Sequence, residues 1–377
     1  MICWATHPQL VLPVSSIRGR RRGLRYLLAA GLVAGLALWG AAESAARSFR
    51  PAHHRIFHGV SDTGHVRDYR VFSRRVRAHN ALLMDFYHWN TPLSTGALDR
   101  WETTRTRGVL SLSTAPGNGH EVLSPRAIAR GRGDRYILRL NESIAGSGQV
   151  VYIRLFPEMN GYWNPYCAYN ASGSRRGRSH STGSFRRAWR RISLILHGGK
   201  RIRVNRRLRR IGLPRIYRAS SNHARVYRRR EVPRRLSHPK VAFMWNPQTI
   251  GSPAKRGNRP AAYWPGGKYV DWVGADIYSA FATPGIWSAY KSFYRSWRHR
   301  PFIVGEYAPW NNDYRGRFTR RLFRWAERHH RVGAMVYYRS VFPNNEFDIN
   351  HWSKARQVIR HHLNKHRFDP FAPGTRR

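Results

Sequence analysis

The stretch VVYIRLFPEMNGYW, residues 150–163, has the pattern of a buried strand that runs into a carboxylate. Its apolar half is followed by Glu158 and then by a loop rich in Gly, Asn and aromatic residues. A second stretch of the same kind, PFIVGEYAPW at residues 301–310, runs into Glu306. One such stretch is equally consistent with a solvated Glu at a strand end. Two of them predict a site to which each strand presents one acid.

Eight apolar, strand-like runs alternate with helix-like stretches from about residue 52 to residue 370. The runs are Arg55–Val60, Ala81–Trp89, Gly108–Thr114, Val150–Phe156, Val241–Trp245, Tyr269–Tyr278, Pro301–Glu306 and Gly333–Ser340. The helix-like stretches include Gly64–His79, Ser184–His197, Gly285–Arg298, Tyr314–His330 and Trp352–Lys365. This alternation predicts an α/β fold, a (β/α)8 TIM barrel. A doubly wound open sheet is the alternative, although no GxGxxG motif follows the first run.

The first 46 residues have the pattern of a targeting segment. An arginine cluster at 18–25 precedes an apolar run at 27–42, and small residues at 42–46 resemble a cleavage site. The run is shorter than the ~20 residues of a comfortable transmembrane helix. A cleaved signal peptide is therefore expected, with an uncleaved signal anchor as the alternative. Either one predicts a secreted or cell-surface protein.

The formal net charge is +49, from 68 Lys and Arg residues against 19 Asp and Glu. The arginines are spread along the chain, with one dense block at about 200–230 that we interpret as a solvated insertion with its own helix. So strong a field predicts adsorption to anionic cell-wall polymers or lipid at low salt. The spread argues against a specific nucleic-acid partner, and a general bias toward Arg would give the same composition.

The two cysteines, Cys3 and Cys167, are not expected to form a disulfide, because Cys3 lies in the targeting segment. Cys167 fits a small buried residue better than a nucleophile. No Cys or His spacing resembles a metal site, so neither a metal nor another cofactor is expected. The chain is expected to be a monomer.

In a parallel barrel, the active site lies at the carboxyl ends of the strands. Glu158 follows the fourth predicted strand and Glu306 ends the seventh, so both should lie at the same mouth. Two facing carboxylates fit glycoside hydrolysis, in which a separation of about 5–5.5 Å gives retention and a wider one inversion. Two acids so close cannot both ionise at low cost, and the one whose pKa rises becomes the proton donor.

Arg154 has the strand parity that points it into the barrel. There it could keep carboxylates charged and pair with an interior acid such as Asp85 or Asp276. Tyr278 is expected to donate a hydrogen bond to Glu306.

Aromatic residues near the strand ends would supply platforms for sugar rings. They are Trp89, Tyr162, Trp163, Tyr166, Trp245, Tyr278, Tyr307 and Trp310. Trp245 fits the core equally well, and Asn246 is predicted to be a polar residue of the binding cleft.

Four segments, in matching order, resemble glycoside hydrolase family 26, which includes β-mannanases. RLFPEMNGYWNPY at 154–166 is similar to its acid/base segment, in which an Arg precedes the Glu by four residues and Met-Asn-Gly and a Trp follow it. FMWNPQ at 243–248, YWPGGKYVDWVGADIY at 263–278 and PFIVGEYA at 301–308 are similar to its fifth, sixth and nucleophile strands.

The resemblance covers most of residues 55–365 and implies a retaining enzyme with Glu158 as acid/base and Glu306 as nucleophile. With the aromatic residues above, it gives a predicted substrate-binding set of Trp89, Arg154, Asn160, Trp163, Trp245, Tyr278 and Trp310. The family usually has a His directly before the acid/base Glu, where this chain has Pro157. That His contacts the central sugar, so its replacement bears on substrate choice and rate.

The sequence therefore predicts a secreted, retaining endo-β-glycanase acting on a polysaccharide, either β-1,4-mannan or a related β-glucan or β-xylan. A second hypothesis is a barrel that binds cell-wall glycan and turns it over weakly, as Pro157 and the charge suggest. A third is a polyanion binder built on another fold.

Overall fold

The computed structural model describes residues 48–61, 64–93, 96–115, 120–216, 232–340 and 346–375. The expected targeting segment and the later part of the Arg-rich block, residues 217–231, lie outside these ranges. The described residues belong to one compact unit, Ala45–Arg377. Among them, no helix is both long and apolar enough to cross a bilayer.

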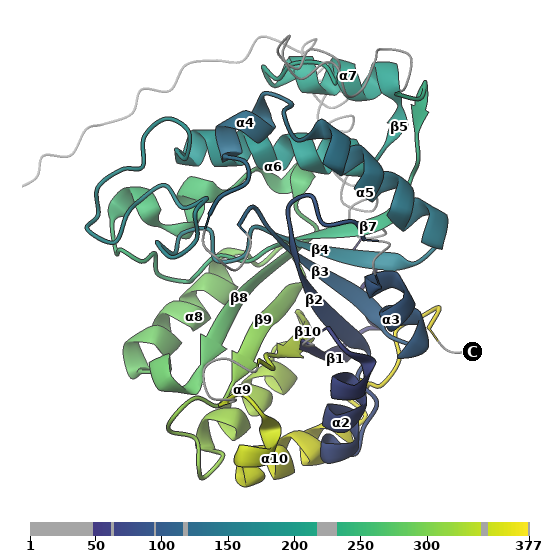
Figure 1. The fold of residues 1–377 in the computed structure, drawn as a ribbon. Coiled ribbons are helices and arrows are strands. Elements are labelled where there is room, and N and C mark those ends of the chain that lie inside the picture. The colour runs from purple at the N-terminus through teal and green to yellow at the C-terminus, as the bar shows by residue number, and fades with distance from the viewer. Residues whose placement is uncertain are drawn as a thin grey trace, which may run out of the picture. The chain divides into compact units, whose positions relative to one another are not determined.

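Eight parallel strands form a closed barrel with helices around its outside (Figure 1). In order around the barrel they are β1 (Ile56–Ser61), β2 (Leu82–His88), β3 (Arg107–Ser113), β4 (Val150–Leu155), β7 (Lys240–Trp245), β8 (Trp272–Tyr278), β9 (Phe302–Ala308) and β10 (Val332–Tyr337). β10 pairs in parallel with β1, with Ala334 opposite Phe57, and this pairing closes the ring. The predicted (β/α)8 barrel is confirmed, and the open doubly wound sheet is excluded.

The described helices are α2 (Val66–Val76), α3 (Ala97–Thr103), α4 (Pro125–Ala129), α5 (Asp134–Ser147), α6 (Thr182–Leu196), α7 (Arg201–Arg210), α8 (Pro284–Ser296), α9 (Arg317–Arg328) and α10 (Ser353–Leu363). Local sequence fixes where several of them begin. The Thr283 side chain accepts a hydrogen bond from the backbone N–H of Ile286, and Pro284 occupies the first turn of α8. Between β7 and β8, a segment described throughout, the connection contains only three 3-10 turns, at Arg256–Asn258, Pro260–Tyr263 and Gly267–Tyr269.

The Arg-rich block begins with α7, so the helix expected there is confirmed for residues 201–210. Two short strands, β5 (Gly199–Lys200) and β6 (Arg235–Leu236), pair antiparallel and bracket the block. A last strand, β11 (Phe368–Asp369), pairs with the beginning of β1.

The barrel strands alternate between an inward and an outward face. One cluster of buried residues fills the inside, and its strand members are Phe57, Leu82, Met84, Val109, Tyr152, Ala242, Met244, Trp272, Ile303, Ala334 and Val336. The intervening strand residues belong to a larger cluster that packs against the helices. At the amino-terminal end, Arg107 donates hydrogen bonds to Tyr152 and to the carbonyl of Phe49, which closes the barrel floor. This alternation decides which side chains the strands present at the opposite mouth.

Candidate active site

β4 and β8 keep a regular alternation to their ends and so place three polar residues inside the barrel. Tyr152 of β4 lies inside, and Arg154 has the same parity. Trp272 of β8 lies inside, and Asp276 and Tyr278 share its parity. The mouth above the apolar interior is therefore lined by a cation, an acid and a phenol.

Glu306 reaches the inside by another route, because β9 carries a β-bulge. Phe302 and Val304 pack outward, so a regular strand would turn Glu306 outward as well. Val304 and Tyr307 of β9 are three positions apart, whereas their partners are two positions apart both in β8 and in β10. The strand β9 therefore has one extra residue relative to both neighbours. The extra residue turns Glu306 into the barrel and returns Tyr307 to the outer core.

Glycine is the only residue type that fits at position 305, within this bulge. A Cβ built on it would lie 2.0 Å from Oδ1 of Asn246 and 2.6 Å from Oδ1 of Asp276. The glycine thus allows the β9 backbone to lie against two polar side chains beneath Glu306. Asn246 is fully buried there, so its predicted place in the binding cleft is wrong.

Arg154 joins two acids in the interior and is itself about 1 % exposed. Its Nη1 donates to Oε1 of Glu306 at 2.6 Å, and its Nη2 donates to Oδ2 of Asp276 at 2.5 Å. Burial alone would lower the pKa of Arg154, but the negative charges of Asp276 and Glu306 outweigh it and raise the pKa. Asp85, the other acid expected as a partner, pairs with Arg100 instead.

Tyr278 donates a hydrogen bond to Oε2 of Glu306, the contact that the sequence predicted. Burial raises the pKa of Tyr278 well above its usual value, and the negative charge of Glu306 raises it further. The phenol therefore keeps its proton and acts as a donor. Both oxygens of Glu306 are held, one by Arg154 and one by Tyr278, which fixes the orientation of this carboxylate.

Glu158 lies on the loop after β4 and is only partly buried. Its Oε2 accepts a hydrogen bond from Nε1 of Trp163 at 3.0 Å, and its Oε1 accepts one from Nε2 of Gln248 at 3.2 Å. Burial raises the pKa of Glu158, the negative charge of Glu306 raises it further, and Arg154 opposes both. Glu158 is therefore a carboxyl group that holds its proton to higher pH than an ordinary glutamate.

The turn that carries Glu158 has a strained backbone. The φ angles of Phe156 and Glu158 are 48° and 50°, in the left-handed region that residues other than glycine seldom adopt, and Pro157 lies between them. The Asn164 side chain donates to the carbonyls of Pro157 and Glu158, and the Tyr166 hydroxyl donates to that of Pro157 at 2.8 Å. These contacts hold a conformation that aims the carboxyl group toward the mouth.

Asn160 is fully buried, so its predicted contact with substrate is wrong. Its Oδ1 accepts from the backbone N–H of Gln248 at 2.8 Å, and its Nδ2 donates to the Gln248 carbonyl at 2.9 Å. Asn160 thereby fastens the loop after β4 to the loop after β7. It positions Gln248, whose side chain reaches Glu158, a role that no local pattern around Gln248 indicates.

Trp89 and Trp245 are also buried, so their predicted contact with substrate is wrong, and the core position that was the alternative for Trp245 is the one observed. The same geometry explains both. Each has the outward parity of its strand, as the inward neighbours Met84 and Met244 show. Trp89 packs on Tyr136, and Trp245 packs among aromatic residues of the outer core. Two further expected platforms are buried as well, namely Tyr166 and Tyr307.

The mouth instead presents a continuous row of five aromatic rings in edge-to-face contact. The row runs Phe86, Tyr338, Tyr278, Trp310, Phe281, with centroid separations of 5.9, 5.8, 5.8 and 5.2 Å. Phe86 is 41 % exposed and Phe281 is 56 % exposed. The predicted residues Tyr278, Trp310 and Trp163 do lie at this mouth, whereas Phe86, Tyr338 and Phe281 were missed. Inward parity with Met84 and Val336 could have identified Phe86 and Tyr338.

Cys167 is fully buried against Tyr263, as expected for a packing residue. In the described ranges, no group of three or more His, Cys, Asp or Glu is arranged to hold a metal ion.

No protein-family model matches this sequence, and no curated protein resembles it closely enough to be matched. Solved structures do resemble the fold. The YdhT protein from Bacillus subtilis superposes with a TM-score of 0.52 and 13 % identity over 86 % of this chain and 89 % of that one. Bacillus subtilis mannanase man26 superposes with a TM-score of 0.52 and 13 % identity, and the match covers 88 % of this chain and 90 % of that one. A double mutant of Cellulomonas fimi endo-β-1,4-mannanase superposes with a TM-score of 0.51 and 10 % identity, and the match covers 89 % of this chain and 76 % of that one. The barrel therefore has the fold of family 26 mannanases.

Proposed function

We propose that this protein is a retaining glycoside hydrolase that cleaves internal β-1,4 linkages of mannan or of a related β-glucan or β-xylan. The observation that carries the proposal is the unequal environment of two neighbouring acids. Arg154 and Tyr278 fix Glu306 as an oriented carboxylate, whereas burial and charge raise the pKa of Glu158. A nucleophile and a proton donor need these two environments. The mannanase fold supports the choice of substrate class.

In the first step, Glu306 attacks the anomeric carbon while Glu158 gives its proton to the glycosidic oxygen. The C–O bond to the leaving sugar breaks, and an ester forms between Glu306 and the remaining glycan. Glu158, now ionised, takes a proton from a water molecule, which attacks the same carbon and releases Glu306. Two inversions at one carbon leave the configuration unchanged.

Arg154 and the row of aromatic rings support this reaction in different ways. Arg154 is a permanent cation against Glu306 and keeps that acid oriented while the charge on it changes. The five rings offer flat apolar faces along the mouth, which suits a chain of sugar rings. Trp163 donates to Glu158, so a sugar that displaces this contact would release the proton donor for reaction.

Hydrolysis with retention is the test of the proposal. Purified protein is expected to release reducing ends from at least one of mannan, mixed-linkage β-glucan and xylan, and proton NMR should show the β-anomer forming first. A first product with the α-configuration would contradict the assignment of Glu306 as nucleophile. Binding to one of these glycans without release of reducing ends would favour the weak-turnover hypothesis that Pro157 suggests.

The pH dependence of kcat/KM should show Glu158 as the proton donor. Because the pKa of Glu158 is raised and the acid must hold its proton, activity is expected to fall on the alkaline side as pH passes that raised pKa. Glu158→Ala is expected to lower kcat/KM for polysaccharide by about 10²–10⁴-fold.

An activated aryl glycoside, whose leaving group needs no proton, separates this role from a structural one. With that substrate Glu158→Ala should retain the glycosylation step and lose the alkaline limb of the profile. Glu142→Ala, which changes an exposed Glu of α5, is the control and should keep the wild-type profile. An alkaline limb that persists in Glu158→Ala would assign the acid to another residue.

The proposal includes export and a monomeric state. The arginine cluster and apolar run of the first 46 residues support export, because that pattern is typical of a signal segment.

A further inference from the structure

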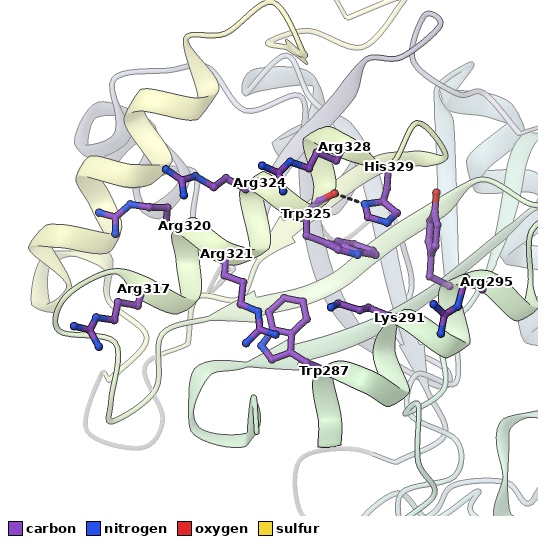
Figure 2. A pocket seen from close by; sticks show the side chains of 11 residues that line it. Trp287, Lys291, Arg295, Arg317, Arg320, Arg321, Arg324, Trp325, Arg328 and His329 are labelled. Atoms are coloured by element: carbon purple, nitrogen blue, oxygen red, sulfur yellow. Dashed lines mark hydrogen bonds between the residues drawn. The ribbon is translucent and has the colours of Figure 1, made fainter. Parts of the chain in front are cut away.

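A pocket of about 540 Å³ lies on the outer wall of the barrel between α8 and α9 (Figure 2). It shares no lining residue with the candidate active site. Among the residues that the structure describes, seven cationic side chains line it, and no Asp or Glu does. They are Lys291 and Arg295 from α8 and Arg317, Arg320, Arg321, Arg324 and Arg328 from α9.

The five arginines of α9 form one face of that helix: Arg320 and Arg321 are adjacent, and each of the others lies three or four residues from a neighbour in the set. All seven cationic residues are exposed. In the described part of the chain, none of them forms an ion pair with an acid. The only acid of α9, Glu327, faces α10 and pairs with His362 and Lys365. The charges around the pocket therefore repel one another until an anion enters.

A second pocket, of about 340 Å³, lies between α9 and α10. Arg320 and Arg324 line both pockets, and Lys354 and Lys365 extend the cationic lining onto the far side of α9. The two hollows thus form a basic track across one helix. A track of this form suits a linear ligand with repeated negative charges better than a single ion.

The aromatic residues of the α8–α9 pocket exclude base stacking as the main contact. Trp287, Tyr294 and Trp325 are 2 %, 7 % and 7 % exposed, and the guanidinium of Arg321 lies 4.4 Å from the centre of the Trp287 ring. Single-stranded nucleic acid binds through open rings on which bases stack, and these rings are covered. A lipid surface is also a poor fit, because α8 and α9 carry none of the exposed large apolar residues of the described chain.

We propose that the α8–α9 pocket and its extension over α9 bind a linear acidic glycan, a polymer of uronate sugars. Guanidinium groups pair with carboxylates through two parallel hydrogen bonds, so a row of exposed arginines suits a polymer that carries one carboxylate on each sugar. This site stands apart from catalysis, so it does not depend on the proposed hydrolase activity. A protein tethered in this way keeps its carboxylate pair free to act on a neutral glycan nearby.

The test compares two triple variants of the full-length protein with equal loss of charge. Arg320→Gln/Arg324→Gln/Arg328→Gln alters the proposed site and leaves the Arg321 contact with Trp287 in place. Arg67→Gln/Arg70→Gln/Arg74→Gln is the control, because it removes three exposed arginines of α2, a helix that α10 separates from α9 (Figure 1). Affinity for a short oligogalacturonate is measured against salt, with a neutral manno-oligosaccharide, oligo(dT) and phosphatidylglycerol vesicles as the other probes.

The α9 variant is expected to bind oligogalacturonate at least about tenfold more weakly than wild type, with a shallower dependence on salt, while the α2 variant stays within about twofold. Equal losses in the two variants would overturn the proposal in favour of diffuse adsorption. Absence of binding by the wild type would overturn it as well. Tighter binding of oligo(dT) or of the vesicles, lost in the α9 variant, would assign the site to nucleic acid or to lipid. Hydrolysis of neutral glycan should be the same in all three proteins, which keeps this result separate from that of the active site.

Discussion

Glu306→Ala is expected to lower kcat for polysaccharide hydrolysis by about 10⁴-fold or more, because it removes the atom that bonds to the anomeric carbon. The fold should persist, since Arg154 keeps its hydrogen bond to Asp276. Glu306→Gln preserves shape and should lose activity to a similar extent. Initial rates and the thermal midpoint of each variant are the measurements.

Rescue by azide tests the chemistry of the same residue. With an activated aryl glycoside, azide can enter the space left in Glu306→Ala and should give an α-glycosyl azide, whereas Glu158→Ala should give the β-anomer. Glu142→Ala again serves as the control for a lost glutamate. Activity of Glu306→Ala within about tenfold of wild type would contradict the nucleophile assignment and with it the retaining mechanism.

Arg154→Met is expected to lower the free energy of unfolding by about 3–5 kcal/mol and to abolish activity, because it leaves two buried acids without their cation. Denaturant unfolding gives the first quantity. Arg139→Met, which changes an exposed residue of α5, is the matched control and should shift stability by less than about 0.5 kcal/mol. Arg154→Met/Asp276→Asn should regain part of the stability while remaining inactive, because one uncompensated charge is gone.

The stability lost in Arg154→Met should increase as pH rises. Burial already raises the pKa of Asp276, and Arg154 opposes that rise. Without Arg154 the pKa in the folded state rises further above the value near 4 of the unfolded chain. The folded state then binds more protons than the unfolded state, so stability falls as pH increases from about 4 upward. A destabilisation that does not grow with pH would show that Arg154 contributes packing rather than charge.

The fold and the inward position of Arg154 follow from simple rules. Eight apolar runs separated by helix-like stretches are enough to predict a barrel, and strand parity alone points Arg154 inward. The same parity would have placed Trp245 and Trp89 against the helices. Both residues stand near strand ends, but closeness to a strand end does not show which face of the strand a side chain occupies.

The inward position of Glu306 cannot be predicted from strand alternation. Alternation along β9 turns this residue outward, and only the bulge at Gly305 brings it into the barrel. A bulge depends on the register of both neighbouring strands, which are distant in sequence. The partnership of Asn160 with Gln248 is equally non-local, since it joins two loops 88 residues apart.

Because β1 pairs with β10, the barrel cannot close until nearly the whole chain has been synthesised. About 280 residues separate the paired positions Phe57 and Ala334, so at ~5–20 residues per second the first strand waits roughly 15–55 s for its last neighbour. During that interval the unfinished sheet has two open edges, to which another nascent chain could add. The net charge of +49 works against such an encounter, since like-charged chains repel before their edges meet. The high arginine content thus disfavours association of unfinished chains while the barrel is still open.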